Sequence, residues 1–270
     1  MSDMANRWAF TLLLASFTVG CIGADEPIRL IAHRGGVVDE YHPENSAAAA
    51  EEGIRRGYWM LEMDLQESKD GRLVVHHDGN FVKSYGVHKT PGELTWDKIR
   101  QFHAVEDGSR PLEFSEYAAL CRGKVQLMID TKEPSHPRAF YESLERTLRE
   151  NGLLEGAYFI GTMEARAWFK GKSRVSVERG ELQKMVDAGE ETSRLYFLFE
   201  HGSTLDEKGI ALANRAGIPA VVSINDFHYS GDHMKQAHAD IERLRRLGLA
   251  YFQIDSAYDI WLPHANAAVR

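Results

Sequence analysis

The chain has 270 residues, of which 43% are hydrophobic and 27% are charged, with 23 glycines and 8 prolines. These fractions are ordinary for a folded protein and exclude a collagen, a low-complexity disordered chain and a polytopic membrane protein. The formal net charge of −8, from 32 Lys and Arg against 40 Asp and Glu, argues against a surface built to bind nucleic acid.

The amino-terminal residues differ in composition from the rest of the chain. Arg7 precedes an uncharged run over residues 8–20, small residues follow, and charge returns at Asp25. This order is typical of an export signal, and the run is shorter than the roughly 20 residues that a membrane-spanning helix needs. A buried helix is the alternative, but the run has no amphipathic period. We therefore expect a signal peptide over residues 1–24 and one domain over residues 25–270.

Two processing routes fit this signal. Cleavage after Ala24 would release a soluble periplasmic or secreted protein. Residues 18–21 loosely resemble a bacterial lipoprotein signal, in which Cys21 would carry lipid and attach the protein to a membrane. Thr18 stands where an aliphatic residue is usual, so we favour simple secretion. Membrane association is expected only if Cys21 is lipidated.

Apolar runs that predict strands alternate with stretches that predict helices along the rest of the chain. In chain order, strands are predicted at 28–32, 58–65, 73–76, 125–130, 157–160, 174–177, 194–200, 218–224 and 251–254. Helices are predicted at 45–56, 95–102, 112–121, 137–151, in a segment ending at 170, at 205–216 and at 240–247. This alternation indicates parallel βαβ units.

Eight or nine strands in one undivided chain suit an α/β fold of the (β/α)₈ TIM-barrel type. A doubly wound sheet is the alternative, but no Gly-x-Gly-x-x-Gly motif follows a predicted strand. One count is inconsistent with a regular barrel. The runs 174–177 and 194–200 cannot both be barrel strands unless the chain has an extra strand.

Polar side chains lie where the predicted strands end, and the carboxyl ends of the strands carry the chemistry of such a barrel. These strand-end residues are His33 with Arg34, Glu62 with Asp64, His77 with Asp78, Asp130 with Lys132, and Asp255. Residues two apart on a strand point to one face, so the carboxylates of Glu62 and Asp64 project together.

The second predicted strand indicates which way these carboxylates point. Met60 shares their face, whereas the apolar residues Trp59, Leu61, Met63 and Leu65 take the other face, which would pack against helices. The carboxylates would therefore point into the barrel, where buried charge needs a partner. Together with the carboxylate of the fourth strand, they make an oxygen-only donor set that favours Ca²⁺ or Mg²⁺.

The remaining polar residues complete a chemical pattern. Two histidines offer an acid and a base near neutral pH. Arg34 and Lys132 add positive charge suited to an oxyanion such as phosphate. Each residue alone has an ordinary structural interpretation, since a lone strand-end histidine is usually a satisfied polar group. The set together predicts metal-assisted acid–base cleavage of a phosphoester.

An ordered set of motifs resembles the glycerophosphodiester phosphodiesterase family. The motifs are His33-Arg34-Gly35, Pro43-Glu44-Asn45-Ser46, Glu62-x-Asp64, His77-Asp78 and Ile129-Asp130-Thr131-Lys132, with fainter matches at Ser223-Ile224-Asn225 and Ile254-Asp255. The resemblance implies a TIM barrel that hydrolyses glycerophosphodiesters to an alcohol and glycerol 3-phosphate. It also implies one bound divalent cation, Ca²⁺ or Mg²⁺.

The resemblance implies a role for individual residues. By its motifs, the catalytic histidines are His33 and His77, the metal ligands are Glu62, Asp64 and Asp130, the residues near the phosphate are Arg34 and Lys132, and a carboxylate at the edge of the site is Glu44. His77 is the match rather than His76, because Leu73, Val75 and His77 share one strand face. We expect His76 to be a packing residue.

The chain also departs from the family pattern. The third metal ligand is Asp130 where the family usually has glutamate, and a shorter side chain would either move the metal or leave room for another water. Lys83-Ser84-Tyr85 replaces an Arg-Thr-Thr segment. Residues 222–225 read Val-Ser-Ile-Asn where Trp-Thr-Val-Asn is usual, so an aromatic wall of the pocket would be lost. These departures leave the alcohol of the substrate open.

Other functions fit parts of the pattern. A phospholipase D-like enzyme that acts on lysophospholipids or sphingolipids would need an apolar mouth, for which the candidates are Phe81, Tyr85, Phe227, Tyr229 and Trp261. A secreted, non-catalytic ligand-binding barrel would not need two histidines. A glycosidase ranks lowest, because neighbouring carboxylates on one strand are badly placed to flank a glycosidic bond.

Overall fold

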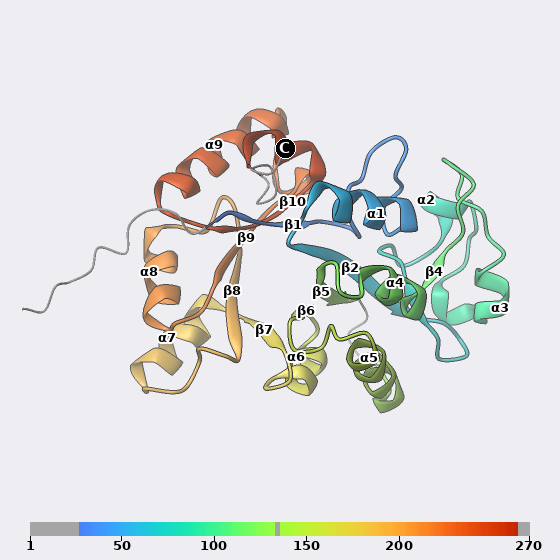
Figure 1. The fold of residues 1–270 in the computed structure, drawn as a ribbon, viewed down its shortest axis with the longest axis horizontal. Coiled ribbons are helices and arrows are strands. Elements are labelled where there is room, and N and C mark those ends of the chain that lie inside the picture. The colour runs from blue at the N-terminus through green and yellow to red at the C-terminus, as the bar shows by residue number, and fades with distance from the viewer. Residues whose placement is uncertain (1–26, 133–135, 264–270) are drawn as a thin grey trace, which may run out of the picture.

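The computed structural model describes residues 27–132 and 136–263 (Figure 1). The predicted signal peptide 1–24, with Cys21, lies outside the described residues. Within them, eight parallel strands form a closed barrel, because β1 pairs with both β10 and β2. In order around the barrel the strands are β1 (Arg29–Ala32), β10 (Tyr251–Ile254), β9 (Ala220–Ile224), β8 (Tyr196–His201), β7 (Arg174–Val177), β6 (Tyr158–Gly161), β5 (Gln126–Thr131) and β2 (Met60–Glu67). The predicted (β/α)₈ barrel is confirmed.

One predicted barrel strand is not part of the barrel. β3 (Leu73–Val75) pairs antiparallel with the end of β2, and β4 (Leu112–Glu113) pairs antiparallel with β3. The turn between β2 and β3 is too short for the crossover that a parallel neighbour requires, so the chain folds straight back. The runs predicted at 174–177 and 194–200 are therefore both barrel strands, and the extra strand is β3.

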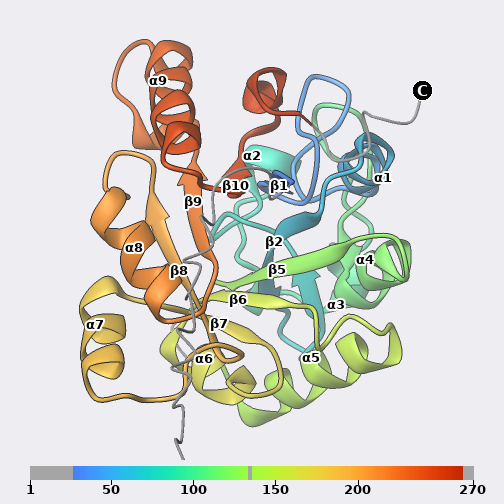
Figure 2. The same cartoon turned by 60° about the vertical axis from the view of Figure 1, so that its left-hand side comes forward.

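Helices lie outside the barrel strands, as Figure 2 shows for α4 to α9. They are α1 (Ala47–Arg56), α2 (Val82–Tyr85), α3 (Trp96–Ile99), α4 (Phe114–Cys121), α5 (Arg138–Glu150), α6 (Met163–Phe169), α7 (Arg179–Asp187), α8 (Glu207–Arg215) and α9 (His233–Arg246). Short 3₁₀ turns cover Pro91–Glu93, Asp226–His228 and Ser256–Trp261. The described part of the chain contains no helix that is both long and apolar enough to cross a bilayer.

Helix boundaries follow local caps. The side chain of Ser46 accepts a hydrogen bond from Ala49 N and starts α1, and Gly57 ends it in the left-handed conformation. Neither α2 nor α7 was predicted from the sequence. The predicted start of α9 lies seven residues too late, because Asp232 caps a polar first turn that shows no apolar period.

The core has two layers that follow the alternation of the strands. Leu61, Met63 and Leu65 of β2 pack in the outer layer with the helices, as predicted. Met60 packs in the inner layer, which fills the barrel. Trp59 was predicted on the outer face, and this is wrong: it precedes β2, and its ring packs in the inner layer, 5.5 Å from the ring of Tyr158. This inner layer fills the barrel below the strand ends that carry the polar side chains.

Candidate active site

Three carboxylates converge at the carboxyl ends of β2 and β5. Glu62 and Asp64 of β2 are 2% and 1% exposed. Asp130 lies directly opposite Asp64 in the parallel register of these strands. One oxygen from each of the three carboxylates lies within 4.8 Å of the others. The structure therefore brings together the three predicted metal ligands.

The electrostatics of this cluster fit a cation. Burial, with the nearby charge of Asp64, raises the pKa of Glu62 to about 8. Burial also raises the pKa of Asp130. It would raise the pKa of Asp64 as well, but Lys132 and His77 outweigh it and hold that pKa below its usual value. A buried donor set made only of carboxylate oxygens fits a hard divalent cation.

A strained turn after β1 wraps around Glu62. Arg34 has a φ of 54°, which is uncommon outside glycine, and its backbone N–H donates to Glu62 Oε2 over 2.9 Å. At Gly36, with a φ of 140°, a Cβ would lie 2.1 Å from the carbonyl oxygen of Ala49. The Arg34 guanidinium donates to Glu44 Oε2 over 2.6 Å. The turn thus presents a backbone donor to one candidate ligand and an arginine beside it.

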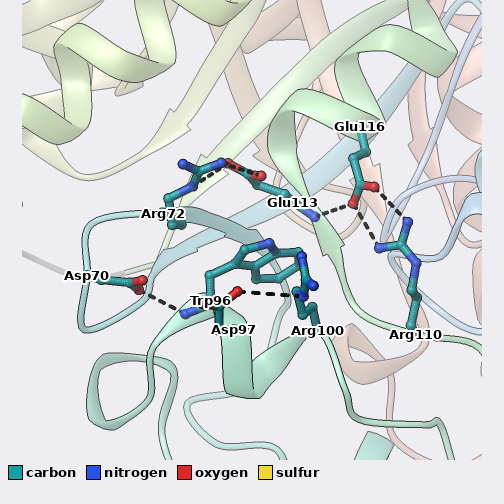
Figure 3. Close-up of a pocket in the computed structure, with 8 residues that line it drawn as sticks. All are labelled: Asp70, Arg72, Trp96, Asp97, Arg100, Arg110, Glu113 and Glu116. Carbon is teal, nitrogen blue, oxygen red and sulfur yellow. Dashed lines mark hydrogen bonds and ion pairs between the residues drawn. The ribbon is translucent and has the colours of Figure 1, made fainter.

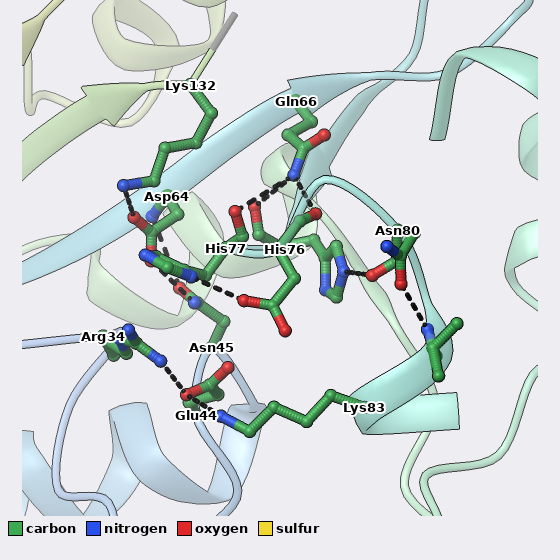
Figure 4. A network of polar contacts seen from close by, with 12 residues as sticks. Arg34, Glu44, Asn45, Asp64, Gln66, His76, His77, Asn80, Lys83 and Lys132 are labelled. Carbon is green, nitrogen blue, oxygen red and sulfur yellow. Dashed lines mark hydrogen bonds and ion pairs between the residues drawn. The ribbon is translucent and has the colours of Figure 1, made fainter. Parts of the chain in front are cut away.

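Asn45 is a site residue that the sequence analysis missed. Its side-chain Nδ2 donates to Asp64 Oδ2 over 2.9 Å, and its side-chain Oδ1 accepts from Asp64 N over 3.3 Å (Figure 4). The residue is buried, with a φ of 58°. The sequence placed Asn45 in the Pro43-Glu44-Asn45-Ser46 motif without giving it this role, and Ser46 caps the following helix. Asn45 fixes the orientation of the Asp64 carboxylate.

His33, at the end of β1, is held by a carboxylate from the opposite end of the chain. Its Nδ1 lies 2.6 Å from Asp255 Oδ1. The Asp255 carboxylate also accepts from Asn225 Nδ2 over 3.2 Å and from Asp226 N over 2.7 Å. Burial lowers the pKa of His33, but Asp255 and the site carboxylates outweigh it, so the pKa is raised. The sequence placed Asp255 at a strand end without giving it this partner.

His77 lies in the turn after β3, where the antiparallel return of the chain carries it back to Asp64. Its Nδ1 lies 2.8 Å from Asp78 Oδ1. The Gln66 amide donates to the carbonyl oxygens of His76, His77 and Asp78 and holds this turn (Figure 4). His76 is buried, and its ring lies 4.7 Å from that of Phe81, consistent with a packing residue.

The remaining predicted residues join the same network. Lys132 Nζ lies 2.9 Å from Asp64 Oδ1 and 2.6 Å from Asp130 Oδ2. Glu44 Oε2 contacts Lys83 Nζ over 3.3 Å as well as Arg34. All eight site residues proposed from the sequence therefore lie at one end of the barrel. Hydrogen bonds, ion pairs and electrostatic interactions connect them.

The predicted apolar mouth is much smaller in the structure. Phe81 is fully buried, the Tyr229 hydroxyl donates a hydrogen bond to Asp240, and Trp261 stacks on His238. Of the five aromatic candidates, Phe227 alone combines high exposure, 61%, with a ring contact to His33, at 5.9 Å between centroids. Val222 packs in the outer core, so the expectation that a missing tryptophan there opens the pocket is wrong.

A second hollow lies away from this site, between the β2–β3 turn, α3 and α4 (Figure 3). Its charges are satisfied by one another: Arg72 pairs with Glu113 and Arg110 pairs with Glu116. A ligand would have to compete with these pairs. The barrel mouth, where acid, base and carboxylates meet, is therefore the candidate active site.

Comparison with known proteins identifies the family of the chain. The model of the glycerophosphoryl diester phosphodiesterase family matches residues 33–252. The chain belongs to this family. Among solved structures, a glycerophosphoryl diester phosphodiesterase from Parabacteroides distasonis is 19% identical, with a TM-score of 0.67 over 92% of each chain. A phosphodiesterase from Oleispira antarctica in complex with the product sn-glycerol-3-phosphate is 16% identical, with a TM-score of 0.66 over 86% of this chain and 94% of that one.

Relatives in sequence match over shorter segments. Lysophospholipase D GDPD1 from Mus musculus is 38% identical over 106 residues, which are 39% of this chain and 30% of the relative. Glycerophosphodiester phosphodiesterase from Bacillus altitudinis is 30% identical over 73 residues, which are 27% of this chain and 29% of the relative. The aligned segments span less than a third of either relative.

Proposed function

We propose that the protein is a metal-dependent phosphodiesterase that hydrolyses glycerophosphodiesters to an alcohol and glycerol 3-phosphate. The observation that carries this is the set of three carboxylates, two of them buried, beside two histidines, each histidine held through Nδ1 by its own carboxylate. The product-bound Oleispira structure supports the glycerol phosphate half of the substrate. A non-catalytic barrel would not need two histidines held in this way.

Different residues of the site would bind the cation, bind the phosphate and transfer protons. Glu62, Asp64 and Asp130 would hold Ca²⁺ or Mg²⁺, which supplies Lewis acidity at the phosphate. Arg34 and Lys132 neutralise the phosphate oxygens. Because Nδ1 of both His33 and His77 is engaged, each presents Nε2 for proton transfer. One takes a proton from the attacking hydroxyl, and the other protonates the leaving alcohol. The attacking oxygen belongs to water, or to the neighbouring glycerol hydroxyl, in which case water then opens the resulting cyclic phosphate to glycerol 3-phosphate.

A panel of substrates tests the proposal. Purified protein is assayed on glycerophosphocholine, glycerophosphoglycerol, lysophosphatidylcholine and sphingomyelin, each with Ca²⁺, with Mg²⁺ and with EDTA. We expect release of glycerol 3-phosphate from the two glycerophosphodiesters with at least one cation and no turnover in EDTA. Cleavage of none of the four with either cation would refute it, as would full activity in EDTA.

A lysophospholipase D activity is the second candidate. The relatives include proteins named lysophospholipase D, and the exposed ring of Phe227 beside His33 offers an apolar surface to an acyl chain. In the same panel, faster turnover of lysophosphatidylcholine than of glycerophosphocholine would favour this candidate. Sphingomyelin cleavage would extend it to sphingolipids.

We also propose that the protein acts outside the cytoplasm after removal of residues 1–24. The composition of this segment supports the proposal. Mass spectrometry of protein from the native host should find Asp25 at the amino terminus. A diacylglycerol-modified Cys21 would instead indicate a lipoprotein, and an intact Met1 would refute export.

A further inference from the structure

The ammonium of Lys132 lies across two of the three candidate metal ligands. Its Nζ is 2.9 Å from Asp64 Oδ1 (Figure 4) and 2.6 Å from Asp130 Oδ2, and its side chain is 25% exposed. The contact with Asp130 is a charge-assisted hydrogen bond, and the contact with Asp64 is an ion pair at a similar distance. In the folded chain, the Lys132 ammonium is therefore a counter-ion to these two carboxylates. This role adds to the one toward phosphate that its position implies.

The two oxygens of the Asp64 carboxylate have different partners. Its Oδ2 already accepts the side-chain amide of Asn45 over 2.9 Å, so Oδ1 is the oxygen with more lone-pair capacity left for a cation. Among the described residues, Oδ1 has no contact of hydrogen-bond length besides the one with Lys132. A divalent cation on Asp64 and the Lys132 ammonium would thus compete for Oδ1.

Asp130 has the same conflict. Its Oδ1 faces Gly161, where an added Cβ would lie 2.4 Å from that oxygen, and its Oδ2 is the atom that Lys132 contacts. A divalent cation bound to the same two carboxylates would lie close to the ammonium, and the two positive charges would repel each other. The buried charge of Asp64 is strongly destabilising without a partner, so the chain needs one cation or the other there.

We propose that Lys132 is a tethered counter-ion that the divalent cation displaces from Asp64 and Asp130, and that the released ammonium then contacts the substrate phosphate. The second half rests on the proposed phosphodiesterase function, whereas the exchange itself requires only the cation. The lysine keeps the carboxylates paired before a cation binds, lowers the affinity for that cation, and becomes available to phosphate when the cation is in place.

Titration calorimetry with CaCl₂ and with MgCl₂ tests the exchange without an activity measurement. We compare wild type with Lys132→Met and Arg34→Met. Arg34 is the matched control because its charge also acts on Asp64, but its guanidinium donates to Glu44 rather than to a candidate ligand. We expect roughly tenfold or greater tightening of the cation in K132M and less than about threefold in R34M.

Thermal unfolding adds a second readout. In EDTA the K132M protein should melt below wild type, and saturating Ca²⁺ should close this gap, because the cation replaces the lost ammonium. Unchanged or weaker cation binding by K132M would overturn the proposal. Equal tightening in K132M and R34M would also overturn it, since a general charge effect would then suffice.

Crystal structures of the wild type test the displacement directly, and need no variant that must fold. With Ca²⁺ bound, Lys132 Nζ should lie beyond hydrogen-bond distance of Asp64 Oδ1 and Asp130 Oδ2, whereas crystals grown in EDTA should retain both contacts. Retention of both contacts beside a bound Ca²⁺ would overturn the proposal. These results are independent of whether any phosphodiester is cleaved, so a failure of the proposed function is recognised separately.

Discussion

At the scale of single residues, the site is built from pairs in which one side chain fixes another. His33 is fixed by Asp255, His77 by Asp78, and Asp64 by Asn45. Fixed tautomers and carboxylate orientations reduce the reorganisation that a reaction requires. Substitution can therefore test the orienting residues Asp255, Asp78 and Asn45 as well as the side chains that they orient.

Replacing either histidine should reduce turnover without unfolding the protein. We expect His33→Ala and His77→Ala each to lower kcat by roughly 10²–10⁴-fold on glycerophosphocholine, because each removes one proton-transfer group. His76→Ala is the matched control. It loses the contact with Phe81 and should lower Tm while keeping most of the kcat. Near-wild-type kcat in both H33A and H77A would contradict the assignment.

Asp255 should act as a positioning residue for His33. Asp255→Asn keeps the size of the side chain but removes the charge that selects the Nδ1–H tautomer. We expect kcat to fall by about 10–100-fold with little change in KM. Long-range ¹H–¹⁵N spectra of the imidazole should show the His33 tautomer altered and that of His77 unchanged. A rise in KM alone, or an unaltered tautomer, would contradict this role.

At the scale of elements, the ends of neighbouring strands decide where the carboxylates lie. β6 ends in Gly161, with a φ of 89°, next to Asp130 of β5. A side chain there would push against the Asp130 carboxylate. The β2–β3 return is equally decisive, since it carries His77 back to Asp64 through the bond from His76 N to Asp64 O.

Gly161→Ala should disturb the cation site as well as the backbone. The new Cβ would meet Asp130 Oδ1 and the backbone of Thr131, so Asp130 must move. Gly152→Ala is the matched control, because Gly152 also has a positive φ, 67°, but has nothing within 4 Å of the added Cβ. Both variants should lose about 1–3 kcal/mol of stability. Calorimetry should show weaker Ca²⁺ binding in G161A alone, and equal affinities would contradict the argument.

The elements also show how far the sequence is informative. The alternation along β2 predicted which side chains enter the barrel, because a strand has a period of two. The run at 73–76 has the same apolar character as a barrel strand, and its antiparallel pairing depends on the turn before it rather than on its own residues. Asn45 and Asp255 were missed as partners because their contacts join residues 19 and 222 positions apart.

At the scale of the whole molecule, pH acts on stability through groups whose pKa differs between the folded and unfolded chain. His136 is such a group. Its side chain is 0% exposed, and its ring stacks on Phe140 at 3.7 Å. Neither ring nitrogen forms a hydrogen bond with any of the described residues, and the Glu67 carboxylate lies 3.6 Å from Nδ1. Burial lowers the pKa of His136 to about 4.

The sign of this linkage predicts loss of stability in acid. The unfolded chain, with a histidine pKa of about 6.5, binds the proton that the folded chain excludes. The contribution of His136 to the free energy of unfolding is therefore complete above about pH 6.5. It decreases by about 1–3 kcal/mol as the pH falls towards 4. His136→Phe keeps the stacked ring and removes the titration, so urea unfolding from pH 7 to 4.5 should show a smaller loss than in wild type. His88→Gln, at an exposed histidine, should leave the profile unchanged. A profile of H136F that falls as steeply as that of wild type would contradict this role, because the proton uptake would then belong to other groups.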